Sequence, residues 1–427
     1  MKKRIKVITL GCSKNSVDTE HLLAALPADE FAVSDEAPLD YLLYNTCGFI
    51  GDAKEESIQA IFEGVEAKKR GEAGRLVVFG CLSERYAAQM PKLIPEVDAW
   101  FGARDLNPLL RYLGAPPSRF VKRHQENRRG YAYLKISEGC DRRCSYCAIP
   151  FIRGAHKSVP VEDLVTEAGQ LASEGVSELI LIAQDTTFYG LDLYGRRSLA
   201  DLLKALSGIK GIERLRIHYS YPADFPEDVL EQMAHNPKVC KYLDIPLQHI
   251  SDVVLDNMHR HIDAEGTRRI IRRLREKVPG VVLRTTMIAG HPGEGEKEFR
   301  ELLDFLREAR FERLGAFIYS EEEGTWGAAH LQDSVPEEEK RRRLDELMSL
   351  QSEISLEYNR SRIGTVERVM VDDAVGGNLV CRSQFESPEV DGEILVPYDG
   401  SAAALIGQYI DVRITDADTY DLMAVRL

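Results

Sequence analysis

The stretch YAYLKISEGCDRRCSYC, residues 131–147, joins a predicted β-strand to three closely spaced cysteines. Its first six residues combine aromatic and aliphatic side chains, which is typical of a strand. The spacing C-x-x-x-C-x-x-C at Cys140, Cys144 and Cys147 offers three thiolates, the usual ligands of an iron–sulfur cluster. A four-iron cluster held in this way keeps one iron open to another ligand. From spacing alone, a zinc site with a distant fourth ligand is the competing interpretation, and free structural thiols are a third.

Strands and helices alternate after this stretch. Residues 131–136 form the first of six predicted strands, and helical patterns follow most of them. The other five predicted strands are residues 178–183, 214–219, 241–246, 281–288 and 313–319. Six such units predict an incomplete barrel of the triosephosphate isomerase kind, whose chemistry lies at the carboxyl ends of the strands. The three cysteines directly follow the first strand, so we expect them at that end.

Three further cysteines follow strands in the first part of the chain. Residues 1–113 alternate short apolar runs with amphipathic stretches, which predicts an open parallel α/β sheet. Cys12 lies just past the run at 6–10, Cys47 past 40–45 and Cys81 past 75–80. Since open α/β sheets bind ligands at the carboxyl ends of their strands, we expect these thiols to face one crevice as a second three-thiol site. Cys240 and Cys381 lack this placement and are predicted to be structural.

The chain of 427 residues is too long for one ordinary core, and its pattern divides it into four parts. A break at residues 114–117 and a basic stretch at 122–129 separate the first two. A helix start is predicted at 334–337, and after Gly364 apolar and polar residues alternate as in a small antiparallel barrel. The predicted parts are residues 1–125, 126–335, a connecting helix at 336–362, and 363–427.

The composition is globular and acidic. No apolar run approaches the ~20 residues needed to cross a membrane. The apolar stretch at residues 5–10 is interrupted by Lys6 and is too short for a signal peptide, so a cytoplasmic protein is predicted. Metal or redox roles for cysteines are favoured over disulfides in that compartment. The formal net charge of −14 argues against general nucleic-acid binding.

Six longer stretches carry a resemblance to a known family. They are LGCSKNSVDTE (10–20), NTCGFIGDAKEESI (45–58), EGCDRRCSYCAIPFIRG (138–154), AQDTTFYG (183–190), YLDIPLQHISDVVLDNM (242–258) and YSEEEGT (319–325). Together with the N-terminal cysteines and a terminal barrel of the type called TRAM, they make the whole chain resemble the radical S-adenosylmethionine methylthiotransferases. Ser13 and His291 are small departures, because the family more often has proline and an aromatic residue there.

This resemblance implies S-adenosylmethionine (SAM) and two four-iron, four-sulfur clusters as cofactors. The C-x-x-x-C-x-x-C cysteines would be the catalytic ones, holding the cluster whose open iron binds SAM. Cys12, Cys47 and Cys81 would hold an auxiliary cluster that carries the sulfur to be inserted. SAM would serve both as methyl donor and as radical source. A non-catalytic iron or zinc protein is the alternative from another class, disfavoured because structural metals normally have a complete ligand set.

Five further residues are candidate SAM contacts. Tyr146, between the last two cysteines, is predicted to stack on the adenine. Gln184 and Asp185 follow a predicted barrel strand, where barrel enzymes touch their ligands. Ile288 and Gly290 follow a later strand and resemble the adenine-side segment of the family. An ordinary structural role is the alternative for each.

Within the family, the chain resembles most the enzymes that modify the β-carbon of an aspartate in ribosomal protein S-twelve. The sibling enzymes that modify an adenosine of transfer RNA would share all six cysteines and are the alternative. Residues 364–427 carry four arginines and twelve acidic residues, a net charge of −8 that would repel phosphates and suits a basic protein. The implied partners are ribosomal protein S-twelve or the small ribosomal subunit, an electron donor and a sulfur source; nucleic acid and membranes are not favoured.

Overall fold

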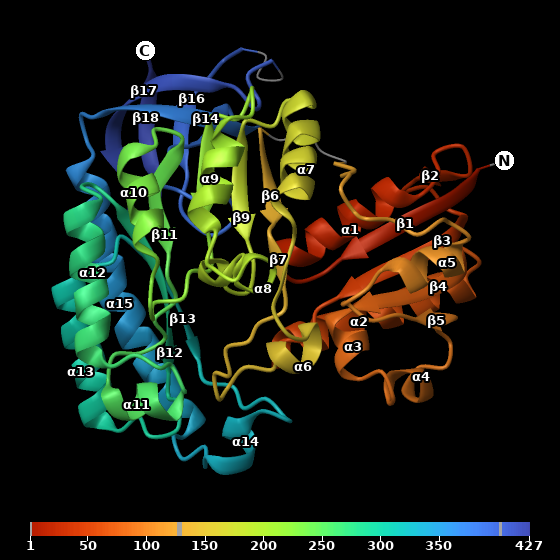
Figure 1. Ribbon diagram of the computed structural model, residues 1–427, viewed down its shortest axis with the longest axis horizontal. Coiled ribbons are helices and arrows are strands. Elements are labelled where there is room, and N and C mark those ends of the chain that lie inside the picture. The colour runs from red at the N-terminus through yellow and green to blue at the C-terminus, as the bar shows by residue number, and fades with distance from the viewer. Residues whose placement is uncertain (1, 126–129, 401–403) are drawn as a thin grey trace.

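The computed structural model describes residues 2–125, 130–400 and 404–427. Residues 126–129, the end of the basic stretch at a predicted domain boundary, lie outside the described residues. An N-terminal α/β unit lies beside a central partial barrel, and a small β-barrel sits on one end of the central barrel (Figure 1). None of the helices in the described ranges is both long and apolar enough for a membrane span.

The N-terminal unit is a five-stranded parallel sheet with the order β2-β1-β3-β4-β5. Its strands are β1 (Lys3–Thr9), β2 (Phe31–Val33), β3 (Leu39–Thr46), β4 (Ala73–Gly80) and β5 (Ala99–Trp100). Its helices are α1 (Ser13–Ala25), α2 (Gly51–Lys69), α3 (Cys81–Arg85), α4 (Met90–Leu93) and α5 (Asn107–Leu113). Apolar side chains of β3 and β4 are buried against helices on both faces, which explains their nearly continuous apolar runs. The predicted open parallel sheet is confirmed. Strand β2 was not predicted, because it has only three residues.

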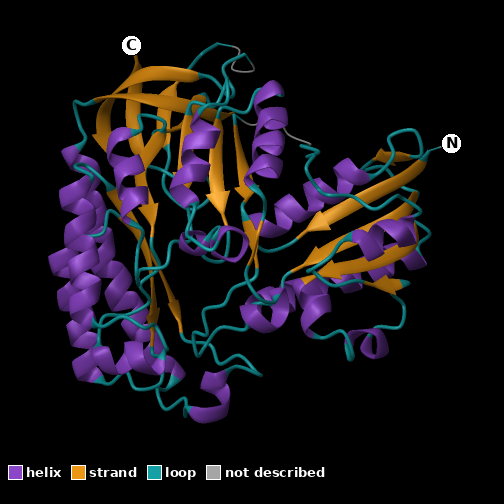
Figure 2. Cartoon of the chain, viewed as in Figure 1, coloured by secondary structure: helices purple, strands orange, loops and turns teal. Residues whose placement is uncertain are grey.

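The central unit is an open six-stranded parallel sheet with the order β13-β12-β11-β10-β9-β6. Its strands are β6 (Tyr131–Lys135), β9 (Glu178–Ile182), β10 (Arg214–Ile217), β11 (Val239–Asp244), β12 (Val282–Ala289) and β13 (Arg313–Ile318). The longer helices are α7 (Val161–Ser173), α9 (Leu199–Ser207), α10 (Glu227–His235), α12 (Ala264–Lys277), α13 (Glu296–Ala309) and α15 (Glu337–Ser361), which cover the outer face (Figure 2). The predicted incomplete barrel of six units is therefore confirmed.

Short elements connect these units. They are β7 (Ser137–Glu138), α6 (Ile149–Arg153), β8 (Lys157–Ser158), the 3-10 helix η1 (Thr186–Phe188), α8 (Leu191–Tyr194), α11 (Asp252–Asn257) and α14 (Trp326–His330). The large core lies between strands and outer helices. A smaller apolar cluster lies on the inner face, where Val17 of α1 packs with Ile180 and Ile182 of β9. Through α1, the N-terminal unit thus covers the exposed edge strand β6.

The C-terminal unit is a closed barrel, as predicted. Its strands are β14 (Val366–Val375), β15 (Asn378–Arg382), β16 (Ile394–Pro397), β17 (Tyr409–Ala417) and β18 (Leu422–Arg426), in the order β14-β15-β16-β18-β17. Four of the five strand pairs are antiparallel as predicted, whereas β16 and β18 pair in parallel, because the chain crosses over between them. It sits at the amino ends of the central strands, away from the cysteine loops (Figure 1). The segment 383–391 enters the interior of the central barrel, where Ser387 contacts His218 at 2.9 Å and Asp391 accepts a hydrogen bond from Tyr242 at 2.7 Å.

Several acidic residues of the terminal barrel form ion pairs inside the protein. Glu386 pairs with Arg313 and Arg362, which are both buried. Asp391 lies 3.6 Å from Arg284 of β12, whereas Asp372 pairs with Arg382 inside the terminal barrel itself. Part of the −8 charge therefore holds the terminal barrel to its neighbour and is not available as an external docking surface.

The ion pair of Glu178 with Arg382 links the two barrels and gives a pH-dependent prediction. Glu178 accepts hydrogen bonds at 2.9 Å from both Arg216 and Arg382. Burial alone would raise the pKa of Glu178, but the two arginines lower it to about 2. Because an unfolded glutamate has a pKa of ~4.3, these pairs stabilise the fold above that pH and lose their effect as the pH falls toward 2.

Replacing Arg382 by methionine is expected to lower the unfolding free energy by ~3–5 kcal/mol at pH 7, because it leaves a buried carboxylate partly unpaired. The difference from the wild type should shrink as the pH falls below ~4. Urea unfolding followed by circular dichroism at several pH values measures both effects. Exposed Arg413 of β17 provides the control Arg413→Met. A difference that stays constant down to pH 2 would contradict the ion-pair explanation.

Candidate active site

Three cysteines meet at the carboxyl ends of neighbouring strands of the N-terminal sheet. Cys12 caps the start of α1 after β1, Cys47 directly follows β3, and Cys81 begins α3 after β4. Gly11 has a φ of +89°, and a Cβ there would lie 2.7 Å from the Cβ and 3.1 Å from the sulfur of Cys47. Glycine thus keeps space free beside the thiol, and the structure brings these three predicted residues together as expected.

Burial makes two of the thiols in this crevice poor free nucleophiles. Burial raises the pKa of the Cys81 thiol to about 11 and raises the pKa of Cys47, to which the neighbouring cysteines contribute. Thiols in this state react poorly, whereas a bound metal cation would hold them as thiolates. The donor set therefore fits an iron–sulfur cluster.

The C-x-x-x-C-x-x-C loop leaves the carboxyl end of the central barrel after β6 and β7. The Cys147 amide donates to the Cys144 carbonyl at 3.1 Å, so the last two cysteines share a tight turn. Burial raises the pKa of Cys140 to about 12 and that of Cys147 further. Arg260 donates to the Cys144 sulfur at 3.4 Å.

In the described ranges, no group of three or more His, Cys, Asp or Glu side chains converges where one metal ion could be held. Ligands of a four-iron cluster need not converge in this way, because each cysteine binds a different iron.

The candidate SAM contacts lie around this loop. The ring of Tyr146 stands edge-on to His291, with centroids 6.1 Å apart. Gln184 donates to Glu138 at 2.9 Å, and Asp185 accepts from Arg142 at 2.9 Å. Within the described residues, the Gln184 Oε1 and Arg142 Nη2 atoms are buried without a partner. A polar ligand beside the loop could form the missing hydrogen bonds with both atoms, so this part of the site fits a polar cofactor.

The two candidates on the β12 side differ in surroundings. Ile288 is half-buried near the end of β12, and its amide donates to the Gln248 carbonyl at 2.8 Å. Gly290 is buried, and its amide donates to both Glu294 carboxylate oxygens at 3.0 Å. A Cβ at Gly290 would lie 2.3 Å from Lys340 Cγ. Gly290 therefore has a packing role of its own in this structure.

Arg153, at the end of α6, connects the two three-thiol sites. Its Nε donates to the Cys81 sulfur at 3.2 Å, and its Nη2 donates to Asn15 at 2.6 Å. Its Nη1 donates to Asp18 of α1 at 2.8 Å and to Glu138 at 3.0 Å. One buried guanidinium therefore joins the N-terminal thiols to the segment that precedes the C-x-x-x-C-x-x-C loop.

Two further arginines, Arg142 of that loop and Arg260, pack on one aromatic ring. Arg142 and Arg260 stack on the ring of Tyr221, at 3.9 and 4.4 Å from its centroid. The Tyr221 hydroxyl donates to the Arg260 carbonyl at 2.5 Å. Hydrogen bonds and charges near cluster sulfurs tune reduction potentials, so Arg260 and Arg153 are placed to act on one thiol site each.

Comparison with known families divides the chain as the fold does. Residues 4–102 match the Uncharacterized protein family UPF0004, residues 134–306 the Radical SAM superfamily, and residues 363–426 the TRAM domain. The Ribosomal protein uS12 methylthiotransferase RimO of Porphyromonas gingivalis (strain ATCC 33277) is 51% identical over 99% of both chains. The chain belongs to the RimO family. RimO of Christiangramia forsetii is 49% identical over 99% of this chain and 94% of its own.

Solved structures agree with the RimO-family fold at low sequence identity. The radical S-adenosylmethionine methyltransferase TsrM from Kitasatospora setae, with cobalamin and a 4Fe-4S cluster bound, has a TM-score of 0.58. It shares 15% identity over 74% of this chain and 75% of TsrM. The cobalamin-dependent radical enzyme OxsB has a TM-score of 0.51 at 12% identity, over 83% of this chain and 56% of OxsB. These likenesses support the fold alone, whereas the RimO relatives make the chain a radical SAM methylthiotransferase.

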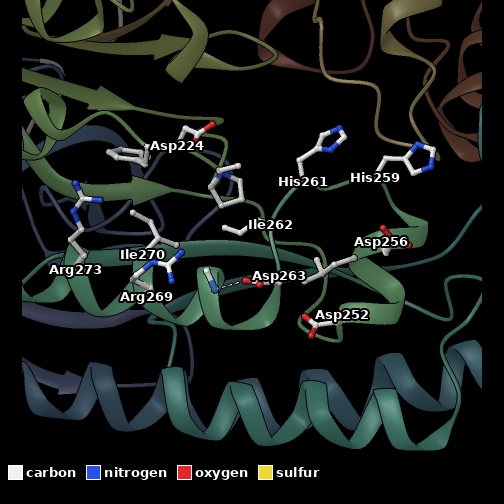
Figure 3. Close-up of a pocket in the computed structure, with 15 residues that line it drawn as sticks. Asp224, Asp252, Asp256, His259, His261, Ile262, Asp263, Arg269, Ile270 and Arg273 are labelled. Carbon is white, nitrogen blue, oxygen red and sulfur yellow. Dashed lines mark hydrogen bonds between the residues drawn. The ribbon is translucent and has the colours of Figure 1, made fainter.

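The RimO-family chain also has a cavity of about 750 Å³ lined by residues of 222–225 and 252–273 (Figure 3). It is lined by Asp224, Asp252, Asp256, Asp263, His259, His261, Arg269 and Arg273, among others. None of the residues predicted from the sequence lines it. His259 also contacts Trp326 of α14, with ring centroids 4.3 Å apart.

Sequence reasoning missed the arginines of the RimO-family site. Arg142 and Arg153 lie inside the stretch 138–154 that carried the resemblance, so their position was a usable signal. Arg260 lies just after the stretch 242–258, so its position in the sequence gave no such signal. Its role depends on a contact with Cys144, 116 residues earlier.

Proposed function

We propose that this chain transfers a methylthio group to the β-carbon of an aspartate in ribosomal protein uS12. One observation carries the proposal: relatives named for that activity are about half identical over almost the entire chain. The transfer-RNA alternative is not favoured by these relatives. Modification of a ribosomal protein implies a cytoplasmic location, with an electron donor and a sulfur source as further partners.

Two clusters are part of the proposal. The thiols of Cys140, Cys144 and Cys147 would hold the catalytic cluster, and those of Cys12, Cys47 and Cys81 the auxiliary one. The donor sets, the space beside Gly11 and the incomplete hydrogen bonding of Gln184 and Arg142 support this assignment. When bound, SAM supplies the methyl group and the radical that removes a hydrogen atom from an unactivated carbon.

The residues of the chain would position these groups. Tyr146 and Ile288 would border the adenine, with Gly290 shaping the segment behind it. Gln184 and Asp185 would present polar groups at the barrel rim, where Asp185 also fixes Arg142. Arg153 and Arg260 would each place positive charge on one thiol set.

Intact mass spectrometry tests the function directly. The purified, cluster-loaded protein is incubated with uS12, SAM and dithionite. The expected result is a gain of one methylthio group in place of one hydrogen, localised to an aspartate by fragmentation. In cells lacking the gene, uS12 should lose the same mass. Unmodified uS12 together with methylthiolated transfer RNA would overturn the proposal.

A further inference from the structure

Lys14 is a buried cation in the second position of α1. Its side chain belongs to a residue that is only 8% exposed, and its Nζ lies 3.3 Å from the centroid of the Tyr219 ring. An aromatic face attracts an ammonium group but does not neutralise it. The ammonium also carries three hydrogen-bond donors.

Most other buried cations of the described residues are paired with carboxylates. Nine further lysines and arginines are buried, namely Arg123, Arg153, Arg216, Arg260, Arg313, Lys340, Arg343, Arg362 and Arg382. Eight of them form ion pairs with carboxylates. Arg260 donates instead to a sulfur and to the Pro246 carbonyl. Within the described part of the chain, Lys14 has no such acidic partner, which leaves a place for an anionic ligand.

Lys14 connects the start of α1, beside the N-terminal thiol site, to the central barrel. It follows Cys12 by two residues, and it shares a helix face with Val17, one turn later, which packs inside the central barrel. The Tyr219 carbonyl accepts from the Thr186 amide at 3.0 Å, next to Asp185 at the carboxyl end of β9. The ammonium thus lies at the carboxyl end of the central barrel, two residues along the chain from Cys12.

We propose that Lys14 holds the carboxylate of the acceptor aspartate. The inference rests on the proposed function and adds a specificity determinant to it. The carboxylate is one bond from the β-carbon, so a cation that fixes it also fixes the reacting carbon between the two clusters. A nucleoside has no carboxylate, so Lys14 would favour a protein acceptor over transfer RNA.

Binding measurements with matched variants test this role. Isothermal titration calorimetry gives the affinity of the cluster-loaded enzyme for uS12 and for uS12 with its acceptor aspartate changed to asparagine. Lys14→Met should weaken binding of uS12 by ~10-fold or more, because a charge-assisted hydrogen bond is lost. It should make little difference to the asparagine form, since both changes remove the same contact. Lys14→Arg should restore part of the affinity.

Lys3 provides the matched control. It lies at the other end of β1, where its Nζ stands 4.9 Å from the Phe31 ring centroid. Lys3→Met should bind uS12 like the wild type. Iron content measured on each variant shows whether the cluster beside Cys12 is intact.

Three results with the Lys14 variants would overturn the inference. Equal losses for both forms of uS12 would mean that Lys14 does not contact the aspartate. A loss of SAM affinity without uS12 would assign the carboxylate to the cofactor, and a loss of iron would make Lys14 structural. If the wild type neither binds nor modifies uS12, the proposed function falls and the inference falls with it. That failure is distinct, because it appears before any variant is compared.

Discussion

Alanine substitution of Cys12, Cys47 and Cys81 together is expected to abolish methylthio transfer to uS12 and to remove about half of the bound iron. The reason is that these thiols form one of two separate donor sets, each at the carboxyl end of its own sheet. The C-x-x-x-C-x-x-C loop remains, so reductive cleavage of SAM should persist in this variant. Iron analysis, visible absorbance and product mass measure the three effects.

A second variant, which lacks the other three cysteines, tests the assignment of the catalytic cluster. Alanine at Cys140, Cys144 and Cys147 should also retain about half of the iron but should lose both SAM cleavage and transfer. Cys381→Ala is the control, because Cys381 is buried in the core of the terminal barrel and should leave the iron content unchanged. Full iron content after loss of the N-terminal thiols would show that they hold no cluster.

Replacing Arg153 by methionine is expected to lower the unfolding free energy by ~3–5 kcal/mol and to make the reduction potential of the auxiliary cluster more negative. Burial alone would raise the pKa of Glu138, but Arg153 and Lys135 lower it to about 2, so the guanidinium helps to stabilise this buried carboxylate in its charged form. The same change removes a hydrogen bond and a positive charge from the Cys81 sulfur.

A redox titration followed by electron paramagnetic resonance measures the potential. The protein should carry alanine at Cys140, Cys144 and Cys147, so that only the auxiliary cluster contributes. Urea unfolding measures the stability. Exposed Arg111 of α5 gives the control Arg111→Met, which should change neither quantity. An unchanged potential in Arg153→Met would limit Arg153 to a structural role.

The sequence allowed prediction of features that depend on neighbours in the chain. Cys12, Cys47 and Cys81 could be grouped because each follows a recognisable strand, and parallel strands end at one edge of a sheet. The same logic placed the C-x-x-x-C-x-x-C loop. Strand β2 was missed because three residues show too little periodicity.

Features that depend on distant partners could not be predicted. Arg153 meets Asp18 across 135 residues, and an arginine in a buried network has the same local pattern as one on a surface. The twelve acidic residues of the terminal barrel were counted as one surface, but Glu386 is buried against Arg313. Side-chain pairing of this kind is set by how the three units dock.

The docking of the terminal barrel has a consequence for the shape of the substrate. The segment 383–391 occupies the amino end of the central barrel, and α1 covers the edge strand β6. An acceptor side chain must therefore approach from the carboxyl end, where both thiol sets and Lys14 lie. A folded protein can present a residue there only on a loop that projects from its surface. The shape of the opening thus restricts which substrates can react. The enzyme should accept an aspartate on a flexible peptide or a protruding hairpin, but not one on a flat protein surface.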